Sequence, residues 1–162
     1  MIQDFCSLPC RFDGFYDGVL SDGVVKLRLK TTKPAEPERD RPPKYDFDII
    51  VSDAEGNEAV AGGIDFWAGY TELFFYAGNS GYEINEEFRG KGYAARACVL
   101  LKELMRFHGM EKIHIGVEPG NRASERVCEK AGASFLLETD VPESSDLYKD
   151  GTPCIRLFVL EA

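Results

Sequence analysis

The stretch GYEINEEFRGKGYA, residues 81–94, decides how this chain folds. A strand pattern ends near Asn85, glycines follow at positions 90 and 92, and a helical pattern begins at Ala94. Glycine lets the backbone approach a ligand closely, and the first N–H groups of the helix and its positive dipole end face the same point. The stretch therefore predicts an anion site suited to phosphate. It also fits a plain strand-to-helix connection that needs positive φ at two residues.

Length and composition indicate a single globular domain over residues 1–162, because 44% of the residues are hydrophobic and 12% are aromatic. No apolar run approaches a membrane span, and the amino end lacks the basic and hydrophobic regions of a signal peptide. We therefore expect a cytoplasmic location and no membrane partner. The net charge of −9 disfavours nucleic acid as a partner and is compatible with a cationic acceptor such as an amine.

Cysteine and histidine usage disfavours disulfides and metal binding. The five cysteines form no Cys-x-x-Cys pair, and the chain has only two histidines. We expect free thiols in a reducing compartment and no metal site. The cysteines are Cys6, Cys10, Cys98, Cys128 and Cys154.

The amino-terminal third has one clear strand between two irregular segments. Residues 1–22 predict a loop or short helix packed on the body, and Val24 to Lys30 alternates as a half-buried strand does. Residues 31–44 contain four prolines among charges, which predicts an exposed loop. That loop is either a solvated connector or a flap over a ligand cleft.

The rest of the chain predicts an antiparallel meander followed by a β-α-β unit. A helix begins at residue 94 and is stopped by Gly109, and a second helix over 122–131 is capped by Asn121. The strand over 112–117 can lie parallel to the strand ending at Asn85. This order predicts an α/β (α+β) fold with a mixed, mostly antiparallel central sheet and few helices on its N-terminal side. The other expected strands cover residues 45–53, 59–67, 73–76, 82–85, 134–138 and 155–160.

Two motifs give the chain a family resemblance. Arg89, Gly92 and Ala94 match the Gln/Arg-x-x-Gly-x-Gly/Ala motif of the GCN5-related N-acetyltransferases (GNAT superfamily). Residues 121–132, NRASERVCEKAG, match the Asn-x-x-Ser-x-x-x-x-Glu-Lys-x-Gly pattern of members of the ribosomal-protein acetyltransferase type. Over residues 45–160 the chain resembles small bacterial members of this superfamily.

The resemblance implies that acetyl-CoA is the co-substrate. Ile84 and Asn85 would pair through their main chain with the pantetheine arm, and Ser124 would lie beside it. Asn121 would also hydrogen-bond this arm, although an N-cap role explains the same residue. The cofactor pyrophosphate would be held by the backbone of Arg89, Gly90, Lys91, Gly92, Tyr93 and Ala94.

The reaction implied by the resemblance is direct attack of an amine on the acetyl thioester. Glu83 is the first candidate for the general base, and its alternative reading is a solvent-facing carboxylate; His114 and Glu118 are further candidates. Many relatives have a tyrosine proton donor where this chain has Cys128. Cys128 is then either a proton donor or a small buried hydrophobe, and Ser124 or water is the alternative donor.

The acceptor side departs from the family. Relatives place two helices between the first two strands, where this chain has only the proline-rich loop. Unless residues 1–22 supply that wall, we expect an open groove that suits a peptide amine or another bulky amine. The strand edges of the family also imply a homodimer. An alternative function is a non-catalytic acyl-CoA-binding sensor or partner module, which would keep the glycine turn and need no base.

Overall fold

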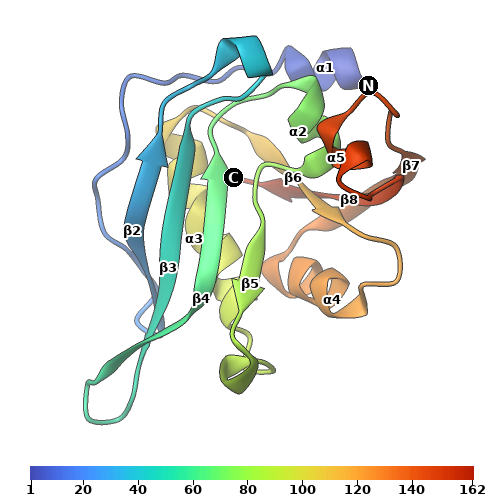
Figure 1. Cartoon of the computed structure of the whole chain (residues 1–162). Helices are drawn as coiled ribbons and strands as arrows, with labels where there is room; N and C mark the ends of the chain where they lie inside the picture. Colours follow the sequence, from blue (N-terminus) through green and yellow to red (C-terminus); the bar gives the residue numbers. More distant parts are fainter.

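The computed structural model describes all residues from Met1 to Ala162 and consists of two antiparallel sheets on either side of a long helix, α3 (Tyr93–Phe107) (Figure 1). The first sheet has the strand order β1-β2-β3-β4-β5 and the second has the order β6-β8-β7. A bilayer-crossing helix is absent, since no helix has the length and apolar character that this requires. The strands are β1 (Leu20–Ser21), β2 (Val25–Lys33), β3 (Lys44–Ser52), β4 (Glu58–Trp67), β5 (Tyr82–Ile84), β6 (Lys112–Val117), β7 (Ser134–Asp140) and β8 (Cys154–Glu161).

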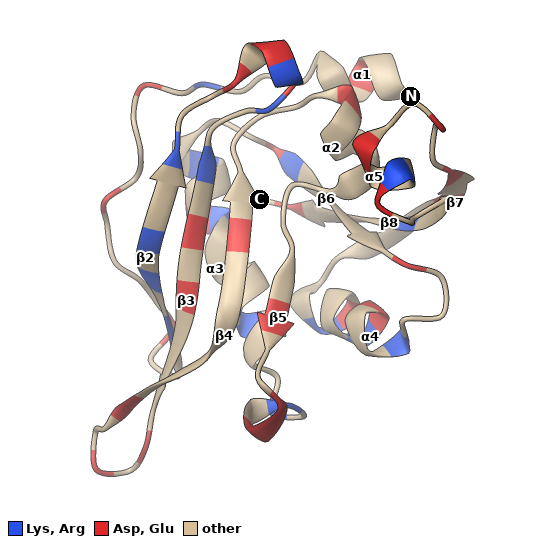
Figure 2. Cartoon of the chain, viewed as in Figure 1, with Lys and Arg blue, Asp and Glu red and all other residues tan.

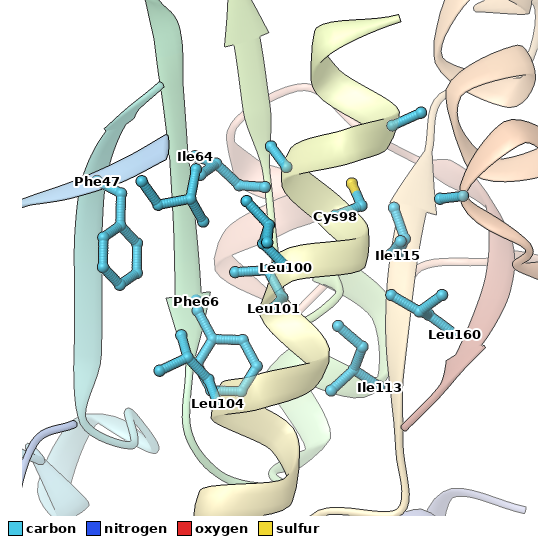
Figure 3. Close-up of a cluster of buried hydrophobic side chains, with 14 of the residues drawn as sticks. Phe47, Ile64, Phe66, Cys98, Leu100, Leu101, Leu104, Ile113, Ile115 and Leu160 are labelled. Atoms are coloured by element: carbon cyan, nitrogen blue, oxygen red, sulfur yellow. The ribbon is translucent and has the colours of Figure 1, made fainter. Parts of the chain in front are cut away.

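The core forms around α3 because this helix is apolar on more than one side. Leu101 and Leu104 are fully buried, and Figure 3 shows α3 between side chains of the first sheet and side chains of the second. Phe47 and Phe66 come from the first sheet, and Ile113 comes from the second. Strands β3 and β4 alternate in burial, so one face of the first sheet packs on α3 and the other face stays open. Figure 2 marks charged positions along both strands.

The two sheets separate between β5 and β6. The two strands are not hydrogen-bonded to each other, so the expected parallel pairing does not form. The sheets instead meet just before β5, at an antiparallel bridge between Gly78 and Ile115. Asn79, which is fully buried, donates its side-chain amide to Gly69 O at 2.7 Å, and its backbone N–H donates to His114 O at 2.8 Å. Beyond this junction the outer edge of β5 is unpaired, and α4 (Arg122–Ala131) lies on that side of it (Figure 1).

One expected strand is a helix. Residues 73–76 belong to α2 (Glu72–Ala77), so the strand prediction there is wrong. The aromatic residues in this segment favour strands by propensity, but Phe74, Phe75 and Tyr76 are all buried, which a half-exposed strand does not allow. Thr71 begins the helix, because its side chain accepts a hydrogen bond from Phe74 N.

The amino-terminal segment forms a short helix, α1 (Ile2–Cys6), and the two-residue strand β1, which the sequence did not predict. Phe5 of α1 packs edge-on against Phe75 of α2. Phe15 and Tyr16 pack on the same core cluster as α3. Residues 1–22 therefore lie against α2 and the α3 side of the first sheet, and they leave its open face uncovered.

The proline-rich connection is shorter than expected, because β2 continues to Lys33 and β3 begins at Lys44. Residues 34–40 are mostly exposed and include a 3₁₀ turn over Pro37–Arg39, whereas Pro42 and Pro43 are buried. The connection joins the end of β2 to the start of β3, and Lys44 pairs with Trp67 at the end of β4. It therefore lies at the opposite end of the sheet from the glycine turn (Figure 1). A further short helix, α5 (Asp146–Lys149), precedes β8.

Candidate functional site

The glycine turn leaves the start of α3 free for a ligand. Gly90 and Gly92 have φ angles of 80° and 79°, and Gly92 is the N-cap residue of α3. A Cβ atom at either position would meet no atom within 4 Å, so backbone conformation and not crowding favours glycine. No side chain caps the helix, so its first N–H groups lack a side-chain partner. The turn therefore has the properties of an anion site.

A cavity of about 430 Å³ opens from this turn and extends between β5 and α4. The turn and β5 form one wall, and α4 from its cap to Lys130 forms the other. The structure thus brings together most of the residues that the sequence predicted for the site. Those that line the cavity are Glu83, Ile84, Arg89, Gly90, Gly92, Tyr93, Ala94, Asn121 and Ser124.

Three predicted site residues do not line this cavity. Asn85 donates its backbone N–H to Ala61 O at 2.8 Å and its side-chain amide to Val60 O at 3.1 Å, so it faces β4. The Lys91 ammonium lies 6.0 Å from the centre of the Phe88 ring. Cys128 is fully buried in α4, and burial raises the pKa of its thiol to about 11.

Arg89 has a structural contact that the motif did not reveal. Its Nε donates a hydrogen bond to Ile84 O at 2.9 Å, which ties the end of β5 to the turn. Because Asn85 directs its N–H toward β4, alternation along the strand directs the backbone groups of Ile84 and Tyr82 toward the free edge. These groups face the cavity, and the Ile84 carbonyl is already occupied by Arg89.

The cavity also contains residues that the sequence analysis missed. Arg126 and Lys130 of α4 bring positive charge to its wall, and Tyr82 lies at its inner end. The spacing of Arg126 and Lys130 was the available signal, since residues four apart share one face of a helix. For Tyr82 the signal was the alternation of β5, which places it on the side opposite to Glu83.

Tyr82 joins the two walls of the cavity through its hydroxyl. Its oxygen lies 2.8 Å from Ser124 Oγ, 3.3 Å from the Ser124 carbonyl oxygen and 3.8 Å from Cys128 Sγ. Burial raises the pKa of Tyr82, with a smaller contribution from Cys128, so the phenol stays protonated. The cluster is therefore a set of neutral donors and acceptors between β5 and α4.

Asn121 caps α4, as its sequence position predicted. Its Oδ1 accepts a hydrogen bond from Ser124 N at 3.1 Å, which places Ser124 on the first turn of the helix. Asn121 also lines the cavity, so its side-chain amide nitrogen remains near the space that a ligand would fill. The cap and the ligand role are thus compatible in one residue.

Glu83 is exposed and makes no hydrogen bond or ion pair through its carboxylate. It lines both the cavity and a second groove of about 490 Å³ on the open face of the first sheet. The two spaces share only Tyr82 and Glu83. Other acidic residues of the groove are Asp46, Asp48 and Asp65.

The two further base candidates have structural contacts. His114 is buried, and because a carbonyl can only accept, its Nδ1 donates to Phe75 O at 2.9 Å. Burial lowers the pKa of His114. Glu118 accepts a hydrogen bond from Thr152 Oγ1 at 3.1 Å. Neither residue lines the cavity or the groove.

The two sheets, the glycine turn between them and the cavity that leads to α4 define an α/β protein with an uncapped helix start of the kind that suits an anion. A family model described as an acetyltransferase (GNAT) domain matches residues 12–134. This chain belongs to that acetyltransferase family, as its two motifs predicted. No curated protein matched the chain by sequence.

Solved structures share the fold at low sequence identity. A structure of the RimL ribosomal L7/L12 alpha-N-protein acetyltransferase with coenzyme A has a TM-score of 0.59 at 13% identity, and the match covers 89% of this chain and 98% of that one. The microcin C7 self immunity acetyltransferase MccE, solved with acetyl-CoA and AMP, has a TM-score of 0.54 at 16% identity and coverages of 78% and 63%. A GNAT-family acetyltransferase from Bacillus anthracis has a TM-score of 0.53 at 21% identity and coverages of 72% and 65%. This chain thus spans less than two thirds of the latter two proteins.

Proposed function

We propose that this protein is an acetyl-CoA-dependent N-acetyltransferase that acetylates a primary amine of a peptide or small molecule by direct attack. The observation that carries the proposal is the uncapped start of α3 at the Arg89–Ala94 turn, which opens on a cavity that extends to Ser124. A cofactor with a phosphate group at one end and a reactive thioester at the other matches this arrangement.

The cofactor role of each wall follows from its chemistry. The backbone N–H groups of residues 89–94 bind the pyrophosphate, with the dipole of α3 favouring its negative charge. Arg126 and Lys130 add positive charge from α4. The free edge of β5 at Ile84 pairs with the amides of the pantetheine arm, as an added strand would. This path leads the thioester toward Ser124.

The chemical roles fall to two residues on opposite sides of the thioester. Glu83 removes a proton from the incoming ammonium, directly or through water, because its carboxylate is unpaired and borders both spaces. Ser124 donates a hydrogen bond to the sulfur as the carbon–sulfur bond breaks. Cys128 is fully buried and does not line the cavity, whereas Ser124 does, so Ser124 is the better placed donor.

The acceptor approaches through the groove on the open face of the first sheet. Neither residues 1–22 nor the proline-rich connection covers this face. The groove is lined by four carboxylates, including the unpaired Glu83, and by one cation, Lys30. Lys44 pairs with Asp46 and Asp65, and Arg28 pairs with Asp48, but the lining stays negative on balance and favours a cationic amine over an anionic acceptor. Its volume of about 490 Å³ has room for a peptide end or a bulky amine.

The test of the cofactor site is a calorimetric titration of acetyl-CoA into the wild type and Gly92→Val. We expect micromolar binding to the wild type and a loss of at least about tenfold in the variant, because valine disfavours the left-handed backbone and projects into the phosphate site. Gly109→Val is the matched control: Gly109 has φ 67°, lies at the other end of α3 and also meets no neighbouring atom. It should lose a similar amount of stability and keep its affinity. Absence of binding to the wild type would overturn the proposal.

A non-catalytic acyl-CoA-binding module is the second candidate, and the burial of Cys128 at the family's tyrosine position favours it. Purified protein with acetyl-CoA and no acceptor discriminates between the two. An enzyme should release CoA slowly by hydrolysis and faster when amines are added. A binding module should bind acetyl-CoA and release no CoA under either condition.

A further inference from the structure

We propose that Tyr82 is a positioning residue for the transfer step: its hydroxyl donates to Ser124 Oγ and so directs the Ser124 proton into the cavity toward the thioester sulfur. The inference rests on the proposed function, and it assigns a role to a residue that the family motifs do not include. It begins from the 2.8 Å contact between the two hydroxyls, one from β5 and one from α4.

The direction of this hydrogen bond follows from the chemistry of the two groups. Tyr82 has one proton and two acceptors within reach, Ser124 Oγ at 2.8 Å and the Ser124 carbonyl oxygen at 3.3 Å. The contact to Oγ is the shorter one, and a phenol is more acidic than an aliphatic hydroxyl, so the Tyr82 O–H is the better donor and Ser124 Oγ the better acceptor. Once Ser124 Oγ accepts from Tyr82, its own proton must point elsewhere. Both residues line the cavity, so that proton is available to a group inside it.

Two further contacts hold this arrangement in place. The backbone N–H of Ser124 donates to Asn121 Oδ1, which fixes the first turn of α4. Cys128 Sγ lies 3.8 Å from the Tyr82 oxygen and is fully buried, so it fills the space behind the tyrosine. In this chain a tyrosine on β5 thus supports the hydroxyl at the cavity, while a cysteine occupies the α4 position.

The reaction balances without a net proton change at Ser124. The amine nitrogen forms a bond to the thioester carbon, the carbon–sulfur bond breaks, and its electron pair goes to sulfur. Ser124 stabilises the resulting thiolate by hydrogen bonding. The nitrogen loses two protons to Glu83 and water, one from the ammonium before attack and one as the amide forms. The thiolate takes up one proton from water to leave as CoA thiol, so one proton is released overall.

The experiment compares wild type, Tyr82→Phe, Ser124→Ala and the double variant. The first readout is the pKa of the thiol of bound CoA. It is measured by titrating the thiolate absorbance of the CoA complex and subtracting the absorbance of the desulfo-CoA complex. We expect a lower thiol pKa in the wild-type complex than in free CoA, and an increase of about 1 in Tyr82→Phe. Desulfo-CoA affinity should be the same in both proteins, since that ligand has no thiol.

The second readout is the rate of acetyl-CoA turnover, with water or an amine as acceptor. Tyr82→Phe should lower kcat about tenfold with little change in KM for acetyl-CoA, as expected for one lost hydrogen bond that acts on the leaving group. The double variant should be no slower than Ser124→Ala, because Tyr82 acts through Ser124. Tyr76→Phe, which removes a hydroxyl from α2 outside the cavity, is the matched control and should behave as wild type.

The outcomes separate this inference from the proposed function. If the wild type binds CoA and turns over acetyl-CoA but Tyr82→Phe has the wild-type thiol pKa and kcat, only the positioning role is overturned. Additive losses in the double variant would also overturn it. If the wild type does not bind CoA, both proposals are overturned together.

Discussion

Two adjacent residues of β5, Tyr82 and Glu83, divide the chemistry of the proposed site. Side chains alternate along a strand, so Tyr82 turns toward Ser124 and the core while Glu83 turns toward solvent and the open groove. The thioester would lie between them. Neighbouring positions in the sequence can in this way act on opposite sides of one reacting bond.

The role of Glu83 leads to a prediction about pH. Glu83→Gln should lower kcat by about 10²-fold or more and shift the acidic limb of the pH–rate profile, because the amide cannot accept the ammonium proton and the reaction then depends on amine that is already neutral in solution. Acetyl-CoA affinity should change little. Rates across the acidic range, measured on both proteins, test this.

The matched control for Glu83 is Glu87→Gln. Glu87 is an exposed carboxylate four residues later that lines neither the cavity nor the groove. It should keep the wild-type profile. A Glu83→Gln protein with the same acidic limb as wild type would remove Glu83 from the mechanism.

At the level of elements, α4 depends on its first turn. The cap at Asn121 starts the helix and positions Ser124, and the basic residues Arg126 and Lys130 follow on the cavity side. The helix ends at Gly132 in the left-handed conformation. One short helix therefore supplies a hydroxyl and two positive charges to the same wall.

The two roles assigned to Asn121 can be separated by substitution. Asn121→Ala should lose about 1 kcal/mol of stability with its cap and should also weaken acetyl-CoA binding. Asn121→Asp keeps an oxygen acceptor for Ser124 N, so stability should be largely retained. If Asn121 contacts the cofactor, Asp should still weaken binding, because it replaces an amide donor with a negative charge near an anionic ligand.

Urea unfolding and calorimetric titration of both Asn121 variants provide the measurements. Normal acetyl-CoA affinity in Asn121→Asp, together with normal stability, would leave Asn121 as a cap only. Weak binding in Asn121→Ala alone would then follow from fraying of the first turn.

Across the whole molecule, two buried histidines join separate parts of the chain. His108 Nε2 lies 2.8 Å from the Tyr45 hydroxyl, and its Nδ1 donates to Arg11 O at 2.9 Å, so it links the end of α3 to the first sheet and the amino-terminal segment. His114 links β6 to α2 through Phe75 O. Burial lowers the pKa of both imidazoles, so each is neutral in the folded protein.

This predicts a loss of stability at mildly acidic pH. Below about pH 6.5 the unfolded chain binds protons at both histidines and the folded chain does not, so the free energy of unfolding falls as pH falls. The loss is at most about 1.4 kcal/mol per histidine per pH unit. Urea unfolding between about pH 7 and about pH 5 should detect it.

Substituting the histidines tests the cause. His108→Gln and His114→Gln should each be less stable than wild type near neutral pH, because a buried contact is lost. The free energy of unfolding of each variant should also decrease less than that of wild type as the pH falls. A variant with the same pH dependence as wild type would show that other groups are responsible.

Features that depend on neighbouring residues could be predicted from the sequence alone. Alternation predicted most strands, the glycines predicted the turn before α3, and Asn121 and Gly132 predicted the ends of α4, because each rule acts within a few residues. The two motifs then indicated the family that the family model confirms.

The tertiary structure decided what depends on contacts between distant segments. The aromatic residues at 73–76 favour a strand by propensity, but Phe74, Phe75 and Tyr76 are all buried, and the segment is a helix. The separation of β5 from β6, which creates the cavity, appears only in the folded chain: β6 pairs with β8 some forty residues later, and the two sheets meet only at the bridge between Gly78 and Ile115. The contact between Tyr82 and Ser124 likewise spans 42 residues and forms only when β5 and α4 meet across that gap. Such pairings have no local signal, because their free energy comes from surfaces that exist only after the chain has folded.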